Sequence, residues 1–138
     1  MDETDFNPWV KNGRFQRESW EQCALMRWVD FMAGKYPELG LLYHVPNGGR
    51  RDEKEAANLK RQGVKPGVPD LCLPVARGKY HGLYVELKVG KNTTTPNQKK
   101  WIDALRHQGY FVDVCYGWNA AADTIENYLK QGEFGYEN

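Results

Sequence analysis

The sequence lacks the segments that would carry a protein out of the cytoplasm or into a membrane. No apolar run approaches the roughly 20 residues that a membrane-spanning helix needs. Residues 1–5 are acidic, whereas a signal peptide begins with basic residues. We therefore expect a cytoplasmic protein that is neither exported nor inserted.

Cysteine is scarce, and its three copies lie far apart at Cys23, Cys72 and Cys115. No CxxC pair and no cluster of cysteine with histidine occurs, so the sequence does not predict a zinc site. An odd number of separated cysteines with apolar neighbours instead predicts buried free thiols in a reducing compartment.

A strong net charge is also missing, because 19 basic residues nearly balance 18 acidic ones. The charges are unevenly spread along the chain. Segment 44–66 holds six basic and three acidic residues, segment 87–107 holds five and one, and both ends are acidic. This distribution fits one positive face that binds a polyanion, and it fits two solvated helical faces equally well.

What the sequence does contain is enough apolar residues, 41% of 138, for one domain with one core. Periodicity and turn signals predict an α/β fold with a mixed central sheet flanked by helices, in the order α-β-α-β-β-α-β-α. We expect one domain over residues 1–138, with its core at about 16–131. The predicted helices cover 16–33, 51–62, 95–108 and 119–131, and the predicted strands cover 41–45, 71–75, 82–88 and 110–116.

Local signals add detail to this order. The second and third strands are close enough in sequence to form a hairpin, and segment 83–116 predicts a right-handed crossover between parallel strands. Thr95, with a glutamine three residues later at Gln98, is typical of a capping box. Asn119 is predicted to cap the last helix, and Phe31 follows the apolar spacing of the first.

Three charged residues are candidates for catalysis. Asp70 stands where a loop with two prolines enters a strand, and Glu86 and Lys88 share one face of the next strand because they are two residues apart. In a hairpin Asp70 can approach Glu86, with the Leu87 carbonyl nearby. Hard oxygen ligands of this kind suit Mg²⁺ or Mn²⁺, and a neighbouring lysine can assist phosphodiester hydrolysis.

An ordinary structural explanation also exists for these residues. A D…ExK spacing occurs by chance, and Glu86 and Lys88 could decorate a solvated face while Asp70 only caps a turn. The context favours a site, because the carboxylates fall at the facing ends of two apolar strands.

The motifs in their order resemble the VRR-NUC nucleases, a branch of the PD-(D/E)xK restriction-endonuclease-like superfamily. The resemblance rests on Gly67-Val68-Pro69-Asp70, Glu86-Leu87-Lys88, Gln98, segment 44–50 and the leading helix. It implies a Mg²⁺- or Mn²⁺-dependent nuclease in which Asp70, Glu86 and the Leu87 carbonyl bind the metal. It also implies that Lys88 is catalytic and that Gln98 supports the active site.

The resemblance further implies a metal-proximal glutamate on the first helix, which is Glu18 or Glu21. It also favours DNA contacts by the loop before the catalytic aspartate. The candidate DNA-binding residues are His44, Asn47, Gly48, Arg50, Arg51 and Lys65.

Small standalone members of this family resemble phage and bacterial proteins that act as homodimeric Holliday-junction resolvases in DNA repair. The resemblance therefore implies a structure-selective endonuclease in a bacterial or phage-infected cell, which acts on branched DNA as a homodimer. Two alternatives stay open, a monomeric flap or nicking nuclease and a non-catalytic nucleic-acid-binding module.

Overall fold

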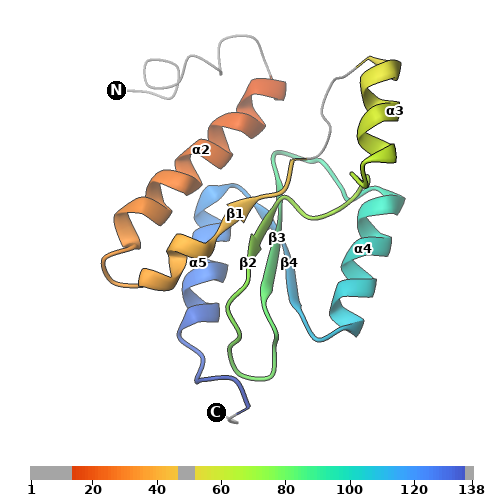
Figure 1. The fold of residues 1–138 in the computed structure, drawn as a ribbon. Helices are drawn as coiled ribbons and strands as arrows, with labels where there is room; N and C mark the ends of the chain where they lie inside the picture. Colours follow the sequence, from red (N-terminus) through yellow and green to blue (C-terminus); the bar gives the residue numbers. More distant parts are fainter. Residues whose placement is uncertain (1–13, 47–51, 136–138) are drawn as a thin grey trace, which may run out of the picture.

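A four-stranded mixed sheet with helices on both sides forms the centre of the molecule (Figure 1). The computed structural model describes residues 14–46 and 52–135. Its elements, in chain order, are α2 (Arg14–Met32), the 3-10 helix η2 (Pro37–Leu41), β1 (Tyr43–His44), α3 (Glu53–Arg61), β2 (Leu71–Leu73), β3 (Leu83–Lys88), α4 (Pro96–His107), β4 (Phe111–Tyr116) and α5 (Trp118–Leu129). This confirms the predicted fold class and the predicted order of α-helices and β-strands.

The strands lie in the order β1-β2-β3-β4. β2 runs antiparallel to both β1 and β3, which confirms the hairpin. β3 runs parallel to its neighbour β4, and α4 connects the two strands along the chain. The parallel pair extends along the whole of β3, whereas the pairing of β2 with β3 ends at Leu71 and Val85. The last residues of β3 therefore have no strand beside them on the β2 side.

The main core lies between the sheet and the pair α2 and α5. Alternate residues of β3, namely Leu83, Val85 and Leu87, point into this core together with Leu25 of α2 and Ile125 of α5. The last helix contributes Ala122, Ile125, Tyr128 and Leu129 to this core, and the structure buries all four. On the opposite side of the sheet α4 covers β4, where Ile102 and Val112 are buried.

Two predictions about α2 and the cysteines are wrong. Phe31 is 84% exposed, because it follows the buried Val29 by two residues and so lies on the opposite side of a helix with 3.6 residues per turn. Cys23 is exposed for the same reason, whereas Cys72 and Cys115 are buried free thiols as expected.

Two predicted element boundaries are also wrong. The strand expected over 41–45 is only Tyr43–His44, because Pro37 begins a 3-10 turn that continues to Leu41 and buries Leu39. Asn119 does not cap α5. The helix begins one residue earlier, and its N-cap is Gly117, whose φ of 87° favours a glycine.

No helix in residues 14–46 or 52–135 is long and apolar enough to cross a lipid bilayer. The ends of the chain beyond 14–135 and the segment 47–51 lie outside the described residues.

The loop that leads to Asp70 packs tightly against the first turn of α4. Gly67 has a φ of 93°, and a Cβ atom added to it would lie 2.7 Å from the main-chain carbon of Asn97. Only glycine allows this approach, because any side chain would push the loop away from α4. The loop is therefore fixed between β2 and the N-terminus of α4.

Gly67→Ala should destabilise the protein more than Gly63→Ala. Both glycines have positive φ, but a Cβ at Gly63 would meet nothing within 4 Å. The difference isolates the contact with Asn97, and we expect overpacking there to cost about 1–3 kcal/mol of unfolding free energy. Urea denaturation of the two variants measures it, and equal losses would contradict the close packing.

Candidate active site

Asp70 and Glu86 lie opposite each other where β2 gives way to the loop. The register pairs Leu71 with Val85, so one step further along the antiparallel pair places Asp70 across from Glu86 on the same face. Asp70 Oδ2 accepts a hydrogen bond from the main-chain nitrogen of Leu87 at 2.8 Å. This bond continues the ladder beyond β2 and holds the Asp70 carboxylate beside β3.

The main chain of Asp70 is fixed as well. Its carbonyl accepts a hydrogen bond from Val45 N at 2.7 Å and lies 2.9 Å from Nδ1 of His44. The short strand β1 thus supports the catalytic loop, and His44 serves this structure whether or not it also contacts DNA.

Glu86 is the most unusual residue of the site. Its side chain is 1% exposed, and neither carboxylate oxygen has a hydrogen-bond partner. Burial, with the nearby charge of Asp70, raises the pKa of Glu86 to about 9. A solvated decorative role for Glu86 is excluded, because a buried carboxylate without a partner needs a proton or a cation beside it.

Lys88 lies on the same face as Glu86 and is only 9% exposed. Its Nζ donates a hydrogen bond to Oε1 of Gln98 at 2.8 Å. The same oxygen accepts from Thr95 N at 2.9 Å, and Gln98 N donates to Thr95 Oγ1. The predicted capping box is present, and its glutamine also holds Lys88.

The Leu87 carbonyl faces the same edge as Asp70. The N–H and C=O groups of one residue in a strand point to the same side, and Leu87 N points to the Asp70 carboxylate. The next carbonyl, that of Lys88, accepts instead from Gly117 N at 2.9 Å on the β4 side. Two carboxylates and one main-chain carbonyl are thus brought to one edge of the sheet.

The two glutamates of α2 have different surroundings. Glu18 precedes the buried Leu25 by seven residues, or two turns, and so lies on the helix face that points to the sheet. Partial burial and the charge of Asp70 raise the pKa of Glu18, and Lys88 lowers it. Glu21 accepts a hydrogen bond from Trp118 N at 2.7 Å. Glu18 therefore lies in the electrostatic field of the site, whereas Glu21 binds the start of α5.

The donor set suits a hard divalent cation that keeps part of its water shell. Within the described residues no three carboxylate, imidazole or thiolate groups converge on one point. Mg²⁺ binds through one or two carboxylates and retains waters, so Asp70, Glu86 and a carbonyl are sufficient ligands. The unpartnered oxygens of Glu86 are the observation that supports this fit.

The structure places the predicted DNA-binding residues only in part. His44 is exposed beside Asp70, and Lys65 is exposed in the loop that precedes it. The remaining candidates lie outside the described residues, namely Asn47, Gly48, Arg50 and Arg51.

Comparison with known proteins agrees with this geometry. The family model of the VRR-NUC domain matches residues 16–119, which is more than half of the chain. The protein belongs to the VRR-NUC family. A solved structure titled "VRR_NUC domain protein" is 37% identical and superposes with a TM-score of 0.73, over 85% of this chain and 91% of that one. No curated protein matches the sequence.

Membership in the VRR-NUC family indicates a nuclease, a hydrolase that acts on DNA. Nucleases of this kind generally use divalent metal ions. The family resemblance drawn from the sequence is thereby confirmed.

The raised pKa of Glu86 should make the metal-free protein less stable as the pH rises. A carboxyl that titrates near 4.5 when unfolded and near 9 when folded favours folding below pH 4.5. That contribution is lost between these two values. Urea denaturation in EDTA at pH 5, 7 and 9 measures the loss.

Glu86→Gln removes the titrating group and should flatten this dependence, so that the variant exceeds the wild type in stability at pH 9. Glu55→Gln, an exposed carboxylate on α3, is the control. A wild-type slope that persists in Glu86→Gln would contradict the assignment.

Proposed function

We propose that the protein is a Mg²⁺- or Mn²⁺-dependent, structure-selective DNA endonuclease, built as one nuclease domain over residues 1–138. Asp70, Glu86 and the Leu87 carbonyl hold the metal, Lys88 and Gln98 complete the catalytic group, and Glu18 adds negative charge beside it. The observation that carries the proposal is the buried Glu86, whose two oxygens accept no hydrogen bond from a donor group and lie beside the carboxyl of Asp70.

The chain's own residues divide the work of hydrolysis. A bound divalent ion would supply positive charge at the scissile phosphate and acidify the attacking water. Leu87 N holds Asp70 in place, and Gln98 takes one of the three N–H donors of Lys88. The remaining donors of Lys88 are free to orient the water and to stabilise the charge that develops on the phosphate.

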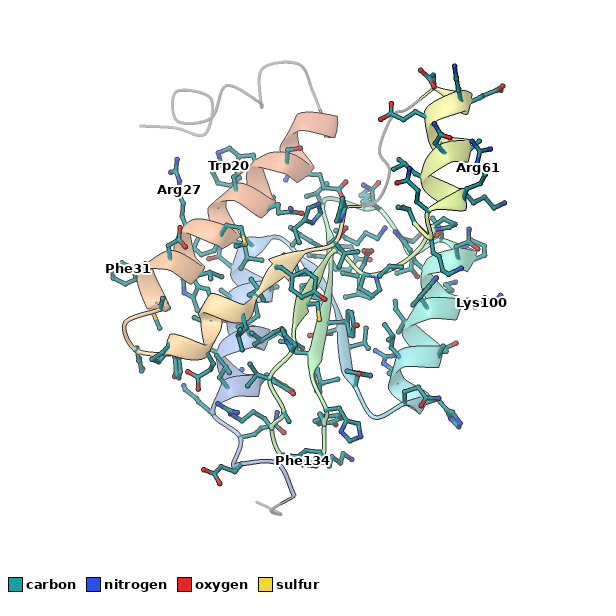
Figure 2. All side chains as sticks on the ribbon, viewed as in Figure 1. Trp20, Arg27, Phe31, Arg61, Lys100 and Phe134 are labelled. Carbon is teal, nitrogen blue, oxygen red and sulfur yellow. The ribbon has the colours of Figure 1, made fainter. Side chains whose placement is uncertain are left out.

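Backbone contacts, rather than base contacts, fit the surface around the site. The nine residues of α3 bury no side chain, and the last turn of this helix carries Lys60 and Arg61. In Figure 2, α3 stands above the start of α4, and Arg61 projects outward from the last turn of α3. We assign the phosphate contacts to this region, including His44 and Lys65. The loop residues Asn47, Gly48, Arg50 and Arg51 are assigned with them.

A Holliday-junction resolvase is the activity that we favour. The chain carries one set of Asp70, Glu86 and Lys88, whereas a four-way junction needs two symmetric cuts. A homodimer with twofold symmetry supplies two sites in the matching arrangement. Exposed aromatic residues offer two separate surfaces for it, with Phe31 at 84% and Phe134 at 47% exposure. A monomeric flap or nicking nuclease is the second candidate, and a non-catalytic binding module is the third.

Asp70→Asn and Glu86→Gln should each reduce cleavage roughly 10²–10³-fold, because each removes a charged ligand from the site. Synthetic four-way junctions, flaps and nicked duplexes with Mg²⁺, with Mn²⁺ and in EDTA measure the activity. Full activity of either variant, or of the wild type in EDTA, would refute the metal site.

Lys88→Ala separates chemistry from metal binding in the same assay. It should lose turnover while Mn²⁺ affinity, measured by calorimetry, stays close to that of the wild type. A proportional loss of both would make Lys88 an organiser of the ligands rather than a catalytic residue.

The protein should sediment as a dimer at micromolar concentration and cut opposite strands of a four-way junction at symmetric positions. Phe31→Glu and Phe134→Glu test the two exposed surfaces. The variant that dissociates the dimer identifies the surface through which the dimer forms. A monomer that cuts flaps or single strands would exclude the resolvase and favour the second candidate.

A further inference from the structure

The turn between β4 and α5 is bound on two sides. Gly117 N donates to the carbonyl of Lys88 at 2.9 Å, and Trp118 N donates to Oε2 of Glu21 at 2.7 Å. The first bond joins the turn to the catalytic strand, and the second joins it to α2. Glu21 is thus linked to the strand of Glu86 and Lys88 through two consecutive main-chain amides.

The start of α5 needs a hydrogen-bond acceptor from elsewhere in the fold. The N-cap residue Gly117 has no side chain, so it cannot accept a hydrogen bond from the first amides of the helix. Glu21 supplies the missing acceptor from 97 residues away in the chain. The contact joins two helices at the end of the sheet where the site lies (Figure 1).

The first described turns of α2 are less deeply buried than the turns that follow. Leu25 is the first fully buried residue in the part of α2 whose side chains are described, and the side chains of residues 17–24 before it are exposed or half-buried. A hollow of about 270 Å³ opens beside Glu21 and is lined in part by Arg17, Val89 and Tyr116. The hydrogen bond to Trp118 is therefore a directional contact that ties this end of the helix to α5.

We propose that Glu21 is a positioning residue, which fixes the first turns of α2 so that Glu18, one turn before it, faces Asp70 and Glu86. The proposal rests on the metal-dependent function above and gives Glu21 a role distinct from that of a ligand. Glu21 acts by the reach of its oxygen and not by its charge.

Two conservative variants separate reach from charge. Glu21→Gln keeps an oxygen at the same distance from the main chain and removes the charge, so it should bind Mn²⁺ like the wild type. Glu21→Asp keeps the charge and is one methylene too short for Trp118 N, so it should bind Mn²⁺ about tenfold more weakly, the loss typical of residues that orient a metal site. Isothermal titration calorimetry of Mn²⁺ with the full chain measures both.

The double variant tests whether Glu21 acts through Glu18. Glu18→Gln/Glu21→Asp should bind Mn²⁺ no more weakly than Glu18→Gln alone, because both changes remove the same contribution. Asp30→Asn, an exposed carboxylate further along α2, is the matched control and should bind like the wild type. Thermal unfolding of each variant confirms that the measured protein is folded.

The outcomes are distinct. Wild-type binding by Glu21→Asp, or additive losses in the double variant, would overturn the positioning role while leaving the metal site intact. A loss in Glu21→Gln equal to that in Glu21→Asp would overturn it in favour of a role for charge. A wild type that binds no Mn²⁺ would refute the metal-dependent function, and the positioning role with it.

Discussion

The placement of Asp70 beside the buried Glu86 is the constraint on which the rest of the structure depends. Two carboxylates that are shielded from water repel each other, and the oxygens of Glu86 have no hydrogen-bond partner. The pairing of β2 with β3 ends at Leu71, so Leu87 N has no main-chain acceptor on that side. It donates instead to the carboxylate of Asp70, which holds Asp70 beside Glu86. Stability is given up at this point, where we propose that a cation binds.

Hydrogen bonds at the starts of two helices, α4 and α5, hold the elements around Asp70 and Glu86 together. The first amides of every helix need acceptors, and here two of the acceptors also serve the site. Gln98 completes the capping box of α4 and holds Lys88. Glu21 accepts from the first residue of α5 and ties α2 to the same region. Helix capping and the geometry of the site therefore depend on the same bonds.

The order of elements could be read from the sequence because it depends on neighbours in the chain. Periodicity, prolines and glycines are local signals, and they predicted the hairpin, the parallel pair and the capping box. They failed where the phase of a helix or the extent of a strand depends on packing. Phe31 follows the apolar spacing but lies on the outer side of α2, and β1 is shortened by the turn that begins at Pro37.

The sequence by itself determined that Glu86 and Lys88 share one face, because side chains alternate along any strand. It also determined that Thr95 and Gln98 cap α4, because three residues separate them in one turn. Only the tertiary structure distinguished the surroundings of Glu18 from those of Glu21, since the partner of Glu21 lies 97 residues away. It also decided that Glu86 is buried without a partner. Burial is set by elements that pack from distant parts of the chain, which no local pattern records.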